Sequence, residues 1–104
     1  MKQLYAKPLR ELEKLLKEAE IPYTFEKSQF FHGGQIVVNI GARKIDAICM
    51  DGSYGSAEGL LEIMGGLTEE EHRKDFVLGY LTPEEVAKRF IYCYKNKTTV
   101  FRQE

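Results

Sequence analysis

The chain has 104 residues, of which 43% are hydrophobic and 30% are charged, a composition typical of one folded domain. Fifteen basic residues face sixteen acidic ones, so the net charge of −1 lacks the basic excess of a dedicated nucleic-acid binder. No apolar run approaches the roughly 20 residues that span a bilayer, and the N-terminus lacks the apolar stretch of a signal peptide, so we expect one cytoplasmic domain over residues 1–104 without membrane contact.

The first expected element is a helix whose apolar residues recur at spacings of three and four. Leu9, Leu12 and Leu16 lie on one stripe of this helix. Pro8 suits the first turn, where its missing N–H removes no hydrogen bond. Pro22 disfavours a helical conformation in the residue before it and predicts the end of the helix.

Three segments with strand-like alternation follow, at residues 23–26, 36–40 and 45–49. The connection at 41–43 is short enough for a hairpin, so these segments predict an antiparallel meander. Residues 59–65 form a short apolar run between glycines, which favours a fourth strand. The apolar run at 76–81 is a candidate for a further strand.

The polar run at 68–75 predicts an exposed loop or a single helical turn. The clearest element follows it, because Thr82, Pro83 and Glu85 form a capping box with proline at the first helical position. Val86 and Phe90 then begin an apolar stripe. The tail at 98–104 either frays or adds a short edge strand.

These elements predict a two-layer α+β fold. Its antiparallel sheet has about four strands, and the N- and C-terminal helices pack on one face. If the other face exposes Val37, Ile48 and Met50 together, a second copy of the chain could cover it, which makes a homodimer a reasonable hypothesis.

Loop aromatic residues are the leading candidates for contact with a partner protein. Phe30, Phe31 and Tyr54 lie in expected loops instead of alternating core positions. Exposed aromatic side chains beside glycines are typical anchors of a protein interface. The alternative is that these loops fold back and bury their aromatics under the sheet edge, and the sequence leaves both interpretations open.

Basic residues support an alternative, a nucleic-acid-binding face. Arg43 and Lys44 lie on the expected hairpin, and Lys88 and Arg89 lie on the last helix. Because glutamates dilute this face and the two helix residues also fit a solvated helix side, we rank nucleic-acid binding second.

A metal-dependent, nuclease-like hydrolase is a distant third hypothesis. Asp46 and Glu62 on strands, with Glu11 or Glu18 on the first helix, loosely follow the order of carboxylates that hold Mg²⁺ in such enzymes. The lysine two residues after the second strand carboxylate is absent, since Met64 stands there. We favour the interpretation that both strand carboxylates face solvent.

Other chemistry-bearing residues also fit structural roles. Cys49 and Cys93 lie in an expected strand and on an apolar helix stripe, where they serve as small buried hydrophobes. His32 and His72 are expected in solvated loops. The glycines at 52–56 fit turns better than a phosphate cradle. We therefore expect no catalytic residue, cofactor or metal site.

The segments at 59–65 and 79–86, with the compact helix–strand opening, resemble small uncharacterised proteins of Gram-positive prophages and mobile elements. This resemblance implies an accessory role in a bacterial host and assigns no site residue. A non-catalytic protein that acts through protein–protein contacts is therefore our first hypothesis for function.

Overall fold

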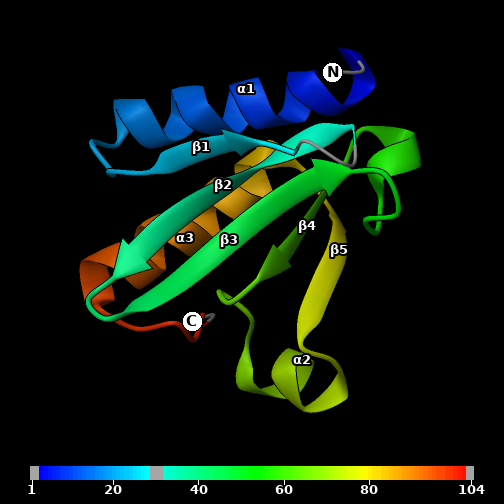
Figure 1. Ribbon diagram of the computed structural model, residues 1–104. Coiled ribbons are helices and arrows are strands. Elements are labelled where there is room, and N and C mark those ends of the chain that lie inside the picture. Colours follow the sequence, from blue (N-terminus) through cyan, green and yellow to red (C-terminus); the bar gives the residue numbers. More distant parts are fainter. Residues whose placement is uncertain (1–2, 29–31, 103–104) are drawn as a thin grey trace.

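The computed structural model describes residues 3–28 and 32–102 of the chain (Figure 1). Its elements follow in the order α1 (Gln3–Glu18), β1 (Thr24–Lys27), β2 (Gly33–Ile40), β3 (Arg43–Met50), the 3-10 helix η1 (Ser56–Glu58), β4 (Leu61–Met64), α2 (Glu69–Lys74), β5 (Val77–Leu81) and α3 (Pro83–Asn96). The strands lie between the two long helices in the chain, which is the order of an α+β domain.

The strands form one antiparallel sheet in which each strand pairs with the next one along the chain, β1-β2-β3-β4-β5. The expected α+β fold is confirmed, whereas the expected number of about four strands is corrected to five. The fifth strand is β5, which pairs with β4. The expected hairpin has Ile40 opposite Arg43, with two turn residues between them.

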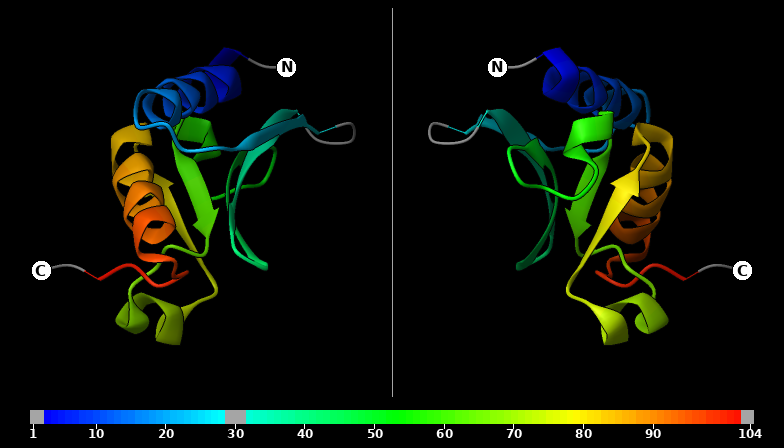
Figure 2. Two further views of the ribbon diagram at one scale, coloured as in Figure 1. Left: turned by 90° about the vertical axis from the view of Figure 1, so that its left-hand side faces the viewer. Right: turned by 90° about the vertical axis from the view of Figure 1, so that its right-hand side faces the viewer.

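The hydrophobic core lies between the two long helices and one face of the sheet. Alternate residues of β2 and β3 point into this core, and each is at most 7% exposed: Ile36, Val38, Ile40, Ile45, Ala47 and Cys49. Figure 1 shows α3 behind β2 and β3, and in both views of Figure 2 the β2–β3 hairpin and α3 lie on opposite sides of the molecule. In the part of the chain that the structure describes, the helices thus cover one face of the sheet and leave the other uncovered.

Helix α1 begins earlier than the sequence predicts. It starts at Gln3, so Pro8 lies inside the helix and not in its first turn. Proline cannot donate a hydrogen bond to the carbonyl of Leu4, which weakens the helix at that point. Tyr5 is only 7% exposed and extends the apolar stripe of Leu9 toward the N-terminus. Packing of this stripe offsets the missing hydrogen bond, because tertiary contacts supply most of a helix's stability.

Two capping boxes start the helices on either side of β5. The expected one is present at α3, where the Glu85 N–H donates to Thr82 Oγ1 over 3.2 Å and the Thr82 N–H donates to Glu85 Oε1 over 3.0 Å. A second box joins Thr68 and Glu71 in the same way, at 3.1 and 2.8 Å. It makes a short helix, α2, from a run whose charges suggested a loop or a single turn.

A buried arginine ties α2 to α3. Arg89 on α3 donates to Glu71 Oε1 over 2.7 Å and to Glu71 Oε2 over 3.0 Å, and it also donates to the Gly66 carbonyl over 3.0 Å. Its side chain is only 10% exposed. Its guanidinium lies 4.9 Å from the centre of the Phe101 ring, which adds a cation–π contact. Bidentate pairing of an arginine with a carboxylate is the strongest kind of ion pair that protein side chains form.

The C-terminal tail packs on the domain as far as the structure describes it. The Phe101 N–H donates to the Leu67 carbonyl over 2.9 Å, and the Gly66 N–H donates to the Thr99 carbonyl over 2.8 Å. Phe101 is only 4% exposed. Of the two alternatives for the tail, fraying or a short edge strand, residues 98–102 do not show fraying: Val100 forms an isolated parallel bridge with Leu67, and the buried Phe101 ring anchors the segment.

We expect Arg89→Met to lower the free energy of unfolding by about 3 kcal/mol, because Glu71 would lose its buried cation. Glu71→Gln should lower the free energy of unfolding by about 1–3 kcal/mol. Equilibrium chemical denaturation measures both. The matched control is Glu70→Gln, whose pair with Lys74 is 3.8 Å long with both side chains largely exposed, and which should change stability by less than about 0.5 kcal/mol.

The same ion pair predicts a pH dependence. The hydrogen bond from Arg89 lowers the pKa of Glu71 from its ordinary value of 4.5. The stabilisation is therefore fully present above pH 4.5 and is lost as the pH falls below that value. The stability difference between the natural protein and Glu71→Gln should shrink in acid. A difference that stays constant from neutral to acid pH would contradict this assignment.

Candidate functional site

The strand register places a band of side chains on the uncovered face of the sheet. Residues directly opposite each other in antiparallel strands share a face. One row across this face runs Thr24, Val37, Asp46, Met64 and Val77. The next row runs Glu26, Gln35, Ile48 and Glu62. Met50 follows on β3. We call Gln35, Val37, Asp46, Ile48, Met50, Glu62 and Met64 the open face.

The open face is more apolar than is usual for a sheet face that is in contact with solvent. Val37, Ile48 and Met50 are half-buried, and Met64 is 54% exposed. An antiparallel sheet with one wet face usually alternates apolar and polar residues, so four apolar side chains on the wet side depart from that pattern. Partly exposed apolar side chains that lie together on one sheet face are typical of a binding face.

A carboxylate lies in the middle of this apolar surface. Gln35 Nε2 donates to Asp46 Oδ2 over 2.7 Å, and Asp46 stands between Val37 and Met64 in its row. Burial raises the pKa of the Asp46 carboxyl, while the hydrogen bonds from Gln35 and from the Met64 backbone act in the opposite direction. Desolvation by the apolar neighbours is thus the dominant influence on this group.

Tyr54 borders the open face beside β4 and β5. Its N–H donates to Glu62 Oε1 over 2.8 Å, and its carbonyl accepts from the Tyr80 N–H over 3.3 Å. Gly79 permits this close approach, since a Cβ there would lie 2.2 Å from the Tyr54 Cβ. Tyr54 is 52% exposed and Tyr80 60%. Of the two interpretations that the sequence left open for Tyr54, the structure therefore shows exposure.

A hollow of about 610 Å³ adjoins the open face at Met64. It is lined largely by apolar atoms, and Leu67, Val100 and the strongly exposed Phe76 contribute to it. Helix α2 forms its other side through His72, whose ring lies edge-on to Phe76 with 5.5 Å between the ring centres. The hollow could hold a side chain of a partner, as interface anchor pockets do.

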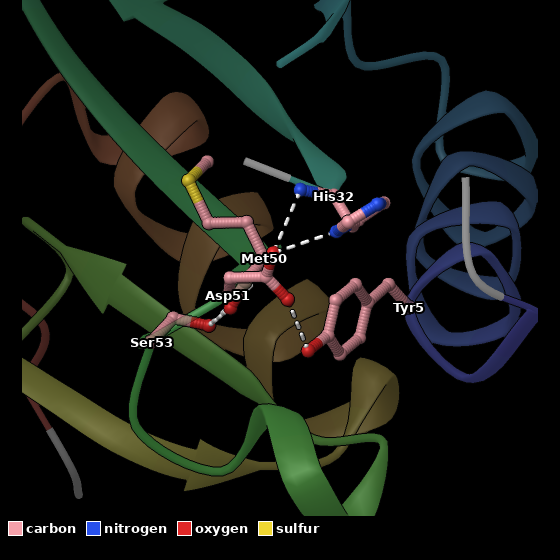
Figure 3. Close-up of polar contacts among 5 residues, drawn as sticks. All are labelled: Tyr5, His32, Met50, Asp51 and Ser53. Atoms are coloured by element: carbon pink, nitrogen blue, oxygen red, sulfur yellow. Dashed lines mark hydrogen bonds and ion pairs between the residues drawn. The ribbon is translucent and has the colours of Figure 1, made fainter. Parts of the chain in front are cut away.

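Phe30 and Phe31, the other two predicted partner-binding residues, lie outside the described residues. His32, the residue that follows them, is held by hydrogen bonds with Asp51. Asp51 Oδ2 lies 2.7 Å from His32 Nδ1 and accepts from the His32 N–H over 3.2 Å, and the Asp51 N–H donates back to the His32 carbonyl over 3.1 Å (Figure 3). Tyr5 donates its hydroxyl to Asp51 Oδ1 over 2.8 Å. This cluster fastens the start of β2 to the end of β3 and to α1.

The contact between His32 and Asp51 has the appearance of a catalytic histidine–carboxylate dyad. Its hydrogen bonds have a structural role, because they join the start of β2 to the end of β3 and to α1. The nearby hydroxyl of Ser53 donates to the Met50 carbonyl over 2.9 Å and accepts from the Met50 N–H over 3.1 Å, so it is engaged in its own turn (Figure 3). The contact between His32 and Asp51 was not predicted from the sequence. The signal was available, because extending the hairpin register by one residue places them opposite each other.

The predicted basic face is not assembled as expected. Arg43 and Lys44 are exposed on the hairpin and Lys88 is exposed on α3, but Arg89 is buried against Glu71. The structure instead brings other basic residues to a groove of about 940 Å³ beside α1. The residues that line this groove are Leu4, Ala6, Lys7, Arg10, Glu11, Lys14 and Lys27.

The carboxylates of the hydrolase hypothesis do not converge. Asp46 and Glu62 point to the open face, whereas α1, which carries Glu11 and Glu18, lies on the other face of the sheet. Within residues 3–28 and 32–102, no group of three histidine, cysteine, aspartate or glutamate side chains could hold a metal ion. The arrangement that would have supported metal-dependent hydrolysis is therefore not found among these residues.

No known protein family, curated protein or solved structure matches this chain. In the part of the chain that the structure describes, no helix combines the length and the apolar character needed to cross a membrane.

The burial of the cysteines gives a direct check of the core. Cys49 and Cys93 are both free and fully buried, and burial raises the pKa of each thiol to about 11. Ellman's reagent needs an accessible thiolate. We expect both thiols to be unreactive in the native protein at mildly alkaline pH and to react fully once it is unfolded in denaturant. Rapid reaction of either thiol under native conditions would contradict the burial of both cysteines in the core.

Proposed function

We propose that this protein is a non-catalytic accessory protein that binds another protein through the open face. The observation that carries the proposal is the apolar character of an uncovered sheet face, with Met64 54% exposed at its edge. Removal of apolar side chains from water is the main favourable contribution to the free energy of protein association. The resemblance to small prophage proteins supports an accessory, partner-binding role in a bacterial host.

The surroundings of the open face support the same proposal. Tyr54 and Tyr80 lie next to each other on one border, and tyrosine is enriched at protein interfaces because it has an apolar ring and a polar tip. The hollow beside Met64 offers a pocket for an anchoring side chain. A partner that spanned the face and this hollow would bury both apolar surfaces together.

A second copy of the chain is an alternative occupant of the open face, as the homodimer hypothesis states. Half-buried Val37, Ile48 and Met50 favour it, since they lie together on that face. Sedimentation equilibrium distinguishes the two cases. A dimer that dissociates in Met64→Lys would assign the face to a second copy, and a monomer at all concentrations would remove this alternative.

Nucleic-acid binding is the second candidate function, and the groove beside α1 favours it. Lys7, Arg10 and Lys14 recur at helical spacing on one side of α1, and Lys27 at the end of β1 joins them. Such a stripe could follow a phosphate backbone. Binding of this kind should weaken steeply with salt and with neutralisation of Arg10.

The test of the proposed function is a pull-down from lysate of the host with the tagged protein after nuclease treatment. Met64→Lys places a charge on the open face and should abolish retention of the partner, because burying the ammonium group is costly. The matched control is Tyr94→Lys, the same substituent at a 37% exposed aromatic residue of α3. It should retain the partner fully.

Equal retention by both variants would contradict binding through the open face. Loss of all bound material on nuclease treatment, together with loss of nucleic acid from an Arg10→Gln variant, would move the second candidate function to first place.

A further inference from the structure

The charge of the open face has one sign. Asp46 lies at its centre, with Val37 and Met64 on either side in the same row. Glu62 stands in the next row on β4, and Glu26 stands at the β1 end of that row. These two rows contain no lysine or arginine. The row directly adjacent to that of Asp46, next to the hairpin turn, carries Lys44 opposite Asn39.

Among the described residues, Asp46 has hydrogen-bond partners and no cationic partner. Gln35 donates to its Oδ2, and none of the ion pairs found between described residues includes Asp46. The carboxylate is half-buried already in the free protein. A partner that covered the open face with apolar atoms alone would remove the remaining water from the carboxylate and leave its charge without compensation, which is unfavourable.

We propose that the open face docks a segment of a partner protein that sets one lysine or arginine against Asp46 and apolar side chains around it. This inference rests on the proposed function and names the chemistry of its partner. A lysine or arginine suits this position because its methylene stem can pack on Val37, Ile48 and Met64 while its charged end reaches the carboxylate. An apolar side chain next to it in the partner would enter the hollow beside Met64.

Charge complementarity separates this occupant from the others. A second copy would bring another Asp46 and another Glu62 to the same face and no basic residue from the two central rows. An acidic peptide or a nucleic acid would meet like charge. A basic and apolar protein segment is the occupant whose charge opposes that of the face.

The test is selection of peptides from a random phage-displayed library on the immobilised natural protein, Asp46→Asn and Asp46→Lys. Peptides selected on the natural protein should carry one lysine or arginine among apolar residues and should not bind Met64→Lys. Synthetic copies should bind Asp46→Asn roughly thirtyfold more weakly or worse, measured by calorimetry. Asp46→Lys should select peptides with aspartate or glutamate at that place. Thermal unfolding of each variant checks that it is folded.

Three results would overturn the inference. The first is selection of apolar peptides without a basic residue that bind the natural protein and Asp46→Asn equally, which would leave binding through the open face intact. The second is that every selected peptide also binds Met64→Lys, which would count against the open face itself as well. A dimer that Met64→Lys disrupts would assign the face to a second copy and overturn the inference as well.

Discussion

Both long helices bury their single apolar stripe against the same face of the sheet, and this one-sided packing is the constraint on which the rest of the structure depends. Leu12 of α1 and Phe90 of α3 are fully buried there. With both helices on one side, the opposite face of β2, β3 and β4 must meet either water or a partner. Its apolar side chains, such as Ile48 and Met64, favour the partner, and the functional proposal follows from that choice.

The buried ion pair between Arg89 and Glu71 shapes the hollow that adjoins the open face. It holds α2 against α3 and, through the Gly66 carbonyl and the Phe101 ring, it fixes the path of the chain on either side of Leu67. These segments form the hollow beside Met64. A charge pair in the interior therefore shapes a feature of the candidate binding surface, although neither residue belongs to the open face.

Local signals predicted much of the fold. The Thr82 capping box, the hairpin turn and the apolar stripe of α1 each lie within a few neighbouring residues, so the sequence alone reveals them. The burial of Arg89 was missed because its partner, Glu71, comes from another helix. The central place of Asp46 depends on the register of three strands, which no local pattern specifies.

The proposed function assigns partner binding to the open face. Methyl NMR of methionine-labelled protein tests it most directly, because Met50 and Met64 carry probes on that face. On addition of a captured partner, or of a selected peptide, both methyl signals should shift or broaden. Binding that leaves both signals unchanged would place the contact surface elsewhere on the molecule and rule out the open face.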